Sequence, residues 1–158
     1  MMLKIRAARE RDLESLNELM FQLHDHHHQA QPELFKTAQE IEQEKRIERY
    51  LKHPEYLVFV AENDAGIIGF ITAHFCELVS SVSKPIPMGS IDEFYVHPKY
   101  RNGEVSIALF HRIEKTLFDY GVAQLFVEVW DFNQVGQGFY KKMGFQPHIH
   151  CLRKSLID

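Results

Sequence analysis

The sequence predicts one α/β domain over residues 1–158, built on a mixed sheet with helices on both faces. Stretches with apolar residues at every second position, typical of strands, are interspersed with stretches that repeat every three or four residues, typical of helices. Their order is strand, two helices, three strands, helix, strand, helix, strand. Strands that flank a helix can run parallel, because the helix carries the chain back across the sheet. With 45% apolar residues, the 158-residue chain is long enough for one core.

The first elements are a short strand and two amphipathic helices. The strand covers Leu3 to Ala7, where apolar and basic residues alternate. A helix starts near Leu13, and its inward stripe is predicted to be Leu13, Leu16, Leu19, Met20 and Leu23. A second helix is predicted from about Thr37 to Leu51, with Ile41, Ile47 and Leu51 inward. It ends at His53-Pro54, because proline cannot continue the helical hydrogen bonding.

Three strands follow in the middle of the chain. Tyr56 to Ala61 and Ile67 to Leu78 form a hairpin around a polar turn from Glu62 to Gly66. The segment Val79 to Met88 is predicted as a loop, and Gly89 to Val96 as the next strand.

The last third alternates helices and strands. A helix from about Gly103 to Tyr120 is capped by Gly121. A strand over Leu125 to Trp130, a short helix over Asn133 to Met143 and a closing strand over Phe145 to Leu156 complete the predicted domain.

Composition excludes several classes of function. The formal charge is −4 and the basic residues are scattered, so a nucleic acid is not the expected partner. No stretch has the roughly 18 uninterrupted apolar residues of a membrane helix, and residues 1–10 lack a secretory apolar segment. We therefore expect a soluble, cytoplasmic protein without a membrane partner. Cys76 and Cys151 are far apart in sequence and are expected to be buried free thiols, with a single disulfide as the alternative.

Two segments carry the chemistry. Residues 91–106 join a strand to a helix through a short polar turn, and the unpaired N–H groups at such a helix start are what a pyrophosphate binds. In order, this segment has a strand, His97-Pro98, an aromatic residue, Arg101, a small-residue turn and an amphipathic helix. It resembles the acetyl-CoA-binding segment of GNAT acetyltransferases, and residues 133–145 resemble the second segment of that family. The remaining elements match the family's topology over nearly the whole chain.

The resemblance implies a mostly antiparallel GNAT-type sheet with splayed central strands. It also implies acetyl-CoA as the co-substrate, acetyl transfer to a primary amine, with a small amine or polyamine favoured, and a homodimer. The cofactor-binding residues that it implies are Phe94, Tyr95, Val96, Arg101, Asn102, Gly103, Glu104, Val105, Ser106, Asn133 and Tyr140. Phe94 and Val96 would pair with the pantetheine arm through main-chain groups, as an added strand does.

The phosphate turn departs from the family pattern. Glycine is present only at Gly103, whereas Glu104 and Ser106 stand where the family has small residues. A carboxylate beside a phosphate weakens binding unless it points into solvent. Ser106 and Arg101 can compensate by donating hydrogen bonds to phosphate oxygens.

Three side chains are the predicted catalytic groups. An amine acceptor must lose a proton before attack, and the leaving thiolate must gain one. Tyr140 occupies the family position of the general acid, although helical spacing also fits a core tyrosine. Asp92 and Glu93 are the candidate bases, directly or through water. Strand alternation places them on opposite faces, and Glu93 is favoured for its longer reach.

Several other polar or aromatic side chains have more than one possible role. Asn133 suits either a pantetheine contact or a helix N-cap. The run from His24 to His28 fits a solvated helix end best, with substrate contact and metal binding as alternatives, and no metal site is expected. Trp130 and Phe132 flank the expected splay point, where core packing and contact with a cationic substrate are both open.

Competing classes are a degenerate GNAT domain that binds CoA or a protein partner without turnover, and an unrelated hydrolase or nucleotide-binding fold. The second class is excluded because the sequence has no GxSxG, GxxxxGK[ST] or GxGxxG motif. The departures at Glu104 and Ser106 motivate the first class, whereas Tyr140 and the acidic strand argue against it.

Overall fold

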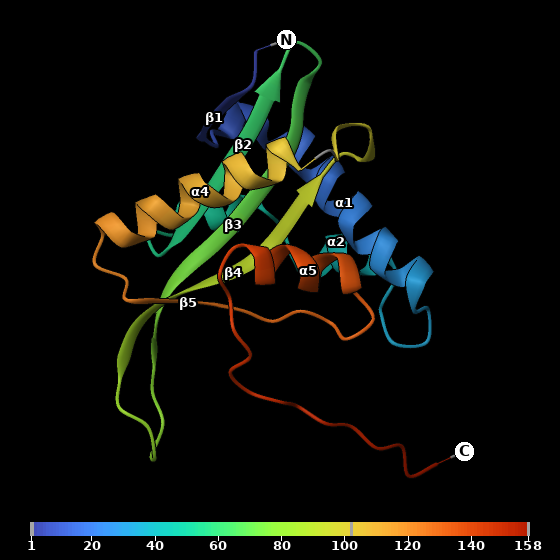
Figure 1. The fold of residues 1–158 in the computed structure, drawn as a ribbon. Coiled ribbons are helices and arrows are strands. Elements are labelled where there is room, and N and C mark those ends of the chain that lie inside the picture. The colour runs from blue at the N-terminus through green and yellow to red at the C-terminus, as the bar shows by residue number, and fades with distance from the viewer. Residues whose placement is uncertain (1, 102, 158) are drawn as a thin grey trace. The chain divides into compact units, whose positions relative to one another are not determined.

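The structure is a computed structural model that describes residues 2–101 and 103–157. It has two compact units, one ending at Val127 and one beginning at Glu128, and each is described by itself. The strands are β1 (Lys4–Ala7), β2 (Tyr56–Asn63), β3 (Gly66–Leu78), β4 (Ile86–Val96) and β5 (Gln124–Val127). The α-helices are α1 (Leu13–Ala30), α2 (Ala38–Glu44), α3 (Glu48–Lys52), α4 (Glu104–Asp119) and α5 (Gln134–Lys142) (Figure 1). Short 3-10 turns cover Glu10–Asp12 and Pro98–Tyr100.

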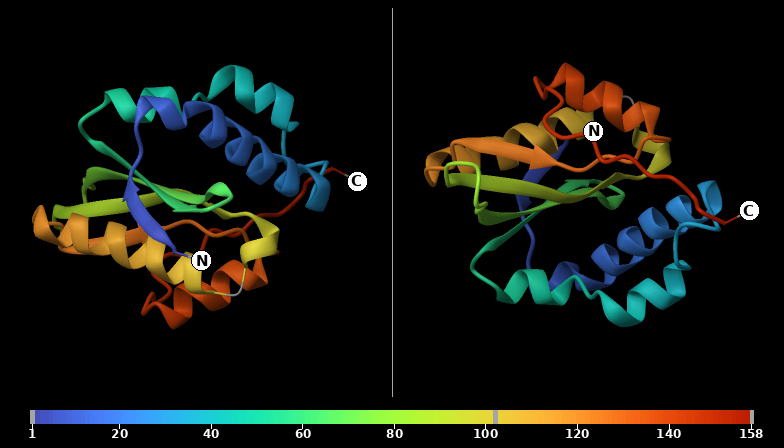
Figure 2. Two further views of the ribbon diagram at one scale, coloured as in Figure 1. Left: turned by 90° about the horizontal axis from the view of Figure 1, so that it is seen from above. Right: turned by 90° about the horizontal axis from the view of Figure 1, so that it is seen from below.

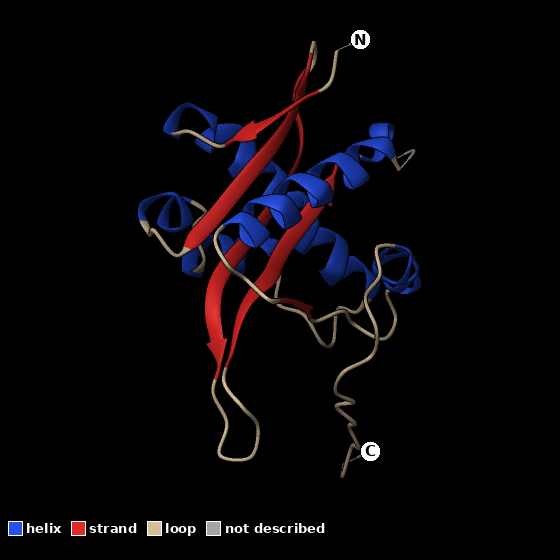
Figure 3. Cartoon of the chain, turned by 60° about the vertical axis from the view of Figure 1, so that its left-hand side comes forward, coloured by secondary structure: helices blue, strands red, loops and turns tan. Residues whose placement is uncertain are grey.

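The first unit contains one five-stranded sheet in the order β1-β2-β3-β4-β5. The pairs β1–β2, β2–β3 and β3–β4 are antiparallel, and β4–β5 is parallel, so the predicted mixed, mostly antiparallel sheet is confirmed. The β4–β5 pairing ends at Ile91↔Val127, although β4 continues to Val96. β3 and β4 also extend beyond the helices as a long hairpin around residues 79–85 (Figure 3).

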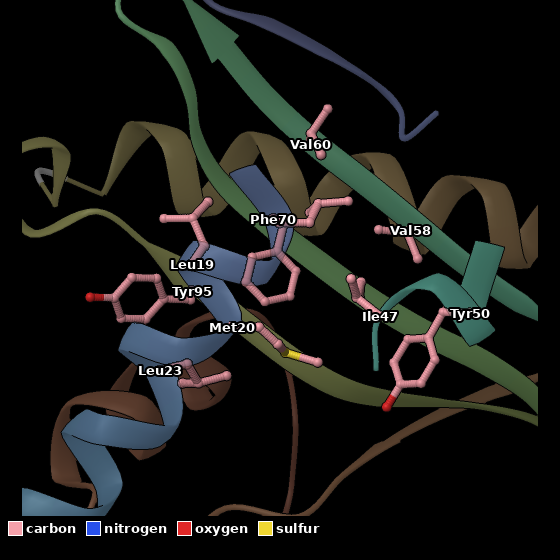
Figure 4. Close-up of a cluster of buried hydrophobic side chains, with 10 residues drawn as sticks. Leu19, Met20, Leu23, Ile47, Tyr50, Val58, Val60, Phe70 and Tyr95 are labelled. Atoms are coloured by element: carbon pink, nitrogen blue, oxygen red, sulfur yellow. The ribbon is translucent and has the colours of Figure 1, made fainter. Parts of the chain in front are cut away.

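Helices cover both faces of this sheet. Viewed along the strands, α1, α2 and α3 lie on one face and α4 lies on the other (Figure 2). The core under α1 is a cluster that includes Leu16, Leu19, Met20, Ile47 and Phe70 (Figure 4). The core under α4 is formed by strand side chains that point to the other face of the sheet. A Cβ built on Gly89 would lie 2.9 Å from Leu117 Cδ1 of α4, so glycine lets that helix pack closely against β4.

The predicted helix over residues 37–51 is two helices rather than one. The Thr37 hydroxyl accepts the Glu40 N–H at 3.2 Å and starts α2 with a capping box. The chain then leaves the helical conformation at Lys45, whose φ and ψ are −127° and 98°, and α3 begins at Glu48. Ile47, which was predicted to face inward, and Tyr50 both lie in the core, whereas Ile41 and Leu51 are partly buried.

Three predicted strands also differ from the structure. The strand over residues 125–130 is the shorter β5, whereas the strand over residues 89–96 begins earlier, at Ile86. The closing strand over residues 145–156 is wrong: this segment has no strand, and residues 146–157 are exposed. Its apolar residues Ile149, Leu152 and Leu156 are exposed to solvent. Apolar content alone is therefore not sufficient for a segment to pair with a sheet.

The second unit contains α5 and irregular chain on either side of it. Asn133 caps α5, because its side-chain Oδ1 accepts the Gly136 N–H at 2.9 Å. Gly144, at a φ of 99°, follows the end of the helix. No helix among residues 2–101 and 103–157 has the length and apolarity needed to cross a bilayer.

Candidate active site

A β-bulge in β4 creates an acidic site at the centre of the sheet. Ile71 pairs with Phe94 and Ala73 pairs with Ile91, so Thr72 of β3 lies opposite two residues, Asp92 and Glu93. The extra residue breaks the alternation of side chains, and both carboxylates lie on the face covered by α1 and α3. The expectation that they point to opposite faces is wrong, because it assumed a regular strand.

Glu93 is buried, with 4% of the residue exposed, and three donors hold its carboxylate. The Tyr50 hydroxyl donates to Oε1 at 2.8 Å, and the Thr72 hydroxyl donates to Oε2. Lys45 Nζ lies 2.5 Å from Oε1. Burial and the neighbouring Glu93 carboxylate raise the pKa of Tyr50 well above its usual range, so its phenol stays a donor.

Asp92 sits at the more open side of the bulge, with 20% of its side chain exposed. His74 Nδ1 lies 2.6 Å from its Oδ2, and the Ser90 hydroxyl donates to its Oδ1 at 3.1 Å. Burial raises the pKa of Asp92, although the bond from His74 opposes that shift. A carboxyl with a raised pKa is a stronger proton acceptor than an ordinary aspartate.

Aromatic rings flank this acidic site. Tyr50 stacks on Tyr56 with ring centroids 4.7 Å apart, and the Tyr56 ring lies 5.3 Å from the ring of His74. A hollow of about 350 Å³ opens beside the two tyrosines; its lining residues are Lys45, Arg46, Arg49, Tyr50, His53, Glu55 and Tyr56. Tyr50 both lines the hollow and bonds Glu93, so the hollow adjoins the acidic site.

Four residues of this site were not predicted from the sequence: Tyr50, Thr72, His74 and Lys45. A signal for two of them exists, because Thr72 and His74 are polar residues two apart in the mainly apolar run from Ile67 to Phe75, on one face. Lys45 and Tyr50 carry no such signal. They reach Glu93 only because the chain breaks between α2 and α3.

The predicted phosphate turn leads from β4 into α4. Gly103 has a φ of 94° and is the N-cap of this 16-residue helix. Among the described residues, a Cβ built on Gly103 would meet nothing within 4 Å, so the glycine is required here by its positive φ and not by close packing. Glu104 is exposed and Ser106 is half-buried, whereas the Val105 side chain is buried and leaves only its main chain for a ligand. Asn102 lies outside the described residues.

The side chain of Arg101 contacts the end of β4. Its Nε donates to the Val96 carbonyl at 2.7 Å, and its guanidinium lies 4.8 Å from the centre of the Tyr95 ring. The His97 N–H donates to the Ile68 carbonyl of β3 at 2.8 Å. Main-chain groups alternate along a strand, so those of Val96 and Phe94 point to the opposite edge of β4. The Val96 carbonyl already accepts the bond from Arg101, so the main-chain pairing of Phe94 and Val96 with a pantetheine arm stays a prediction.

In the second unit, the N-cap interpretation of Asn133 is confirmed, and a role in contacting pantetheine stays a prediction. Tyr140 makes edge-to-face contacts with Phe139 and Phe145 at centroid distances of 5.6 and 5.4 Å. Burial raises the pKa of Tyr140 to about 12, so the phenol is protonated at neutral pH, as a general acid must be. Trp130 is 47% exposed and is not a core residue.

The histidines of α1 are not a simple solvated helix end. His27 stacks on Phe35 at 5.1 Å, and His28 Nδ1 lies 2.9 Å from the Phe35 carbonyl oxygen. Burial, followed by the charge of Lys45, lowers the pKa of His24 to about 4. The Nε2 atom of His24 is buried and has no hydrogen-bond partner within the described part of the chain. In residues 2–101 and 103–157, no three His, Cys, Asp or Glu side chains are placed to hold a metal ion.

Comparison with known proteins defines the class. Residues 20–145 match the acetyltransferase (GNAT) family, and the chain belongs to that family. A crystal structure of an acetyltransferase from Vibrio fischeri is 53% identical, with a TM-score of 0.67 over 80% of this chain and 96% of that one.

More distant structures share the fold. The BH1408 protein of Bacillus halodurans, as a mutant, is 18% identical with a TM-score of 0.85 over 98% of this chain and 99% of that one. The aminoglycoside N-acetyltransferase AAC(6')-Iy in complex with CoA is 20% identical, with a TM-score of 0.74 over 98% of this chain and 94% of that one.

Proposed function

We propose that this protein transfers an acetyl group from acetyl-CoA to a primary amine, most favourably a small amine or a polyamine, by direct attack. The observation that carries the proposal is the pair of carboxylates on the β4 bulge, both on one face and both held by polar partners. A cationic acceptor needs anionic recognition and a base for its proton, and Asp92 and Glu93 offer both.

The donor half of the proposal rests on β4 and the start of α4. The residues present fit a CoA, because Gly103 caps α4 with a left-handed φ and the N-terminal N–H groups of this 16-residue helix suit a pyrophosphate. Arg101 and Ser106 would add donors to the phosphates. When bound, acetyl-CoA supplies a thioester carbonyl activated for attack. A CoA complex of a structural neighbour supports this choice of donor.

The proton transfers are assigned to three side chains. Glu93 is the favoured base, since its carboxylate is fixed by Tyr50 and Thr72 and already holds an ammonium group, that of Lys45. Asp92, with its raised pKa, would accept the proton directly or through water if Glu93 does not. Tyr140 is proposed as the acid that protonates the departing thiolate. Neither Cys76 nor Cys151 lies in the two family segments, which favours direct attack over a covalent enzyme intermediate. A homodimer is proposed on the family resemblance.

Isothermal titration with acetyl-CoA, followed by a thiol-release assay, tests this function. The same preparation is offered a panel of primary amines that includes spermidine, a diamine, an amino acid and an aminoglycoside. We expect saturable acetyl-CoA binding and CoA release that depends on the amine. A titration with CoA is the matched control for donor binding. Absence of acetyl-CoA binding would contradict the proposal, whereas binding without release for any amine would favour the alternative of a degenerate GNAT domain.

A further inference from the structure

The ammonium group of Lys45 occupies the position at Glu93 that an acceptor amine needs. Lys45 lies in the connector between α2 and α3, in an extended conformation, and its Nζ is 2.5 Å from Glu93 Oε1. A general base must lie within hydrogen-bond distance of the proton that it removes. If Glu93 is the base, the amine within its reach in this structure is the protein's own lysine.

This contact differs from the other lysine ion pairs described. Lys36 pairs with Glu44 and Lys115 pairs with Asp119, both at 2.8 Å, but both carboxylates are on the protein surface. The Glu93 side chain is 3% exposed and is fixed by Tyr50 and Thr72, whereas the Lys45 side chain is 46% exposed. A lysine that is accessible from solvent therefore directs its ammonium group into a buried acidic site.

The surroundings of Lys45 match those expected of an acceptor site. Lys45 lines the hollow of about 350 Å³ together with Tyr50 and Tyr56. The positive charge of Lys45 also lowers the pKa of His24, so Lys45 lies near α1 as well as near the bulge of β4. An incoming amine would have to displace this ammonium group to reach Glu93.

We propose that Lys45 is a self-acetylation site, modified by acetyl-CoA when no acceptor amine occupies the site. The inference rests on the proposed function, because it requires acetyl-CoA and Glu93 as the base. Glu93 takes a proton from the Lys45 ammonium group, and the neutral Nζ attacks the acetyl carbonyl. A C–N bond forms, the C–S bond breaks, and its electron pair leaves with sulfur; the nitrogen then loses its second proton, and one proton is taken up by sulfur to give the CoA thiol. The product is a neutral amide at Lys45, and Glu93 returns its proton to solvent.

Self-acetylation would change the site in a definite way. The amide cannot pair with Glu93 as a cation, so the buried carboxylate loses its ionic partner and keeps the donors Tyr50 and Thr72. The modified protein would bind a cationic amine at Glu93 without competition from Lys45. The acetylation of Lys45 would therefore act on acceptor binding, and the affinity of the turn at Gly103 for CoA would be unaffected.

The test is a time course of intact-mass and peptide mass spectrometry with acetyl-CoA and no amine. Lys36 is the matched control, because its ammonium group also pairs with a glutamate and its side chain is 57% exposed. We expect Lys45 to be acetylated at least about tenfold faster than Lys36, since a positioned base contributes about 10²-fold or more. The rate per molecule should not change on dilution of the protein, and Lys45→Arg should remove the modification.

Two further measurements separate catalysis from chemical background. Glu93→Gln should slow the acetylation of Lys45 to the rate of Lys36, which is itself unchanged; circular dichroism checks that this variant folds. In the wild-type protein, a saturating acceptor amine should slow acetylation at Lys45 but not at Lys36, a result that does not depend on the variant.

Equal rates at Lys45 and Lys36 would overturn the proposal as background chemistry. If a preparation that turns over an amine leaves Lys45 unmodified when it is incubated with acetyl-CoA alone, the proposal is overturned too, while the proposed function stands. If acetyl-CoA does not bind at all, both fail together, and the titration shows this independently of the mass measurement.

Discussion

Acid should destabilise the protein through His24, and replacing this residue should remove that sensitivity. Burial lowers the pKa of His24 to about 4 from an ordinary value of 6.5, so the folded protein holds a neutral ring with an unpartnered Nε2. A group whose pKa is lowered on folding contributes stability that is present above the unfolded pKa and is lost as the pH falls toward the folded pKa.

The magnitude follows from the two pKa values. Between pH 7 and pH 5 the unfolded chain takes up a proton at this residue and the folded protein does not, which would lower the free energy of unfolding by about 2 kcal/mol. The ring is only partly buried, so solvent screening reduces the expected loss to about 1 kcal/mol. His24→Met keeps a long apolar side chain in the helix and has no group that titrates.

Urea denaturation at pH 7 and pH 5, followed by far-UV circular dichroism, measures this loss. The His24→Met variant should lose about 1 kcal/mol less than the wild-type protein over this interval. His26→Met, at an exposed position of the same helix, is the control and should keep the wild-type loss. An identical pH dependence for the His24→Met variant and the wild-type protein would refute the assignment of acid sensitivity to His24.

Three further predictions concern other parts of the molecule. Tyr140→Phe should lower the turnover number by about 10²-fold with the acetyl-CoA dissociation constant unchanged, because it removes the proposed acid; unchanged turnover in the thiol-release assay would exclude that role. Glu104→Ala should tighten acetyl-CoA binding in calorimetry by about threefold, because it removes a negative charge from the phosphate turn, and equal affinities would show that this carboxylate does not sense the phosphates. Phe70→Ala should lower the free energy of unfolding by about 4 kcal/mol in urea, because Phe70 is fully buried beneath α1; a loss under about 1 kcal/mol would mean that the core relaxes to fill the space.

Most elements of the fold were predictable from local patterns. The stripe of α1 and the hairpin of β2 and β3 follow directly from periods of 3.6 and 2. The strand predicted over residues 145–156 failed because a strand needs a partner, and pairing is a long-range property that apolar content does not specify. The single helix over residues 37–51 failed because tertiary packing of Ile47 and Tyr50 overrides the local preference.

The candidate site shows the same difference between local sequence information and long-range pairing. Asp92, Glu93, Tyr140 and Gly103 were predicted from residue type and family segments, which are local information. The bulge that turns both carboxylates to one face depends on the register against Thr72 of β3. Register arises from pairing between segments distant in sequence, so alternation counted along β4 alone assigned the wrong faces. Lys45 and His74 were missed for the same reason, since each meets its carboxylate only in the folded chain.

The central claim is that the carboxylates of the β4 bulge serve amine acetylation. The most direct test is the rate of amine-dependent CoA release by the wild-type protein, Glu93→Gln and Asp92→Asn, each confirmed by calorimetry to bind acetyl-CoA. We expect Glu93→Gln to lower kcat/KM for the amine by about 10²-fold or more and to shift the pH dependence of the rate to higher pH. Wild-type kcat/KM and an unaltered pH profile in both variants would contradict it.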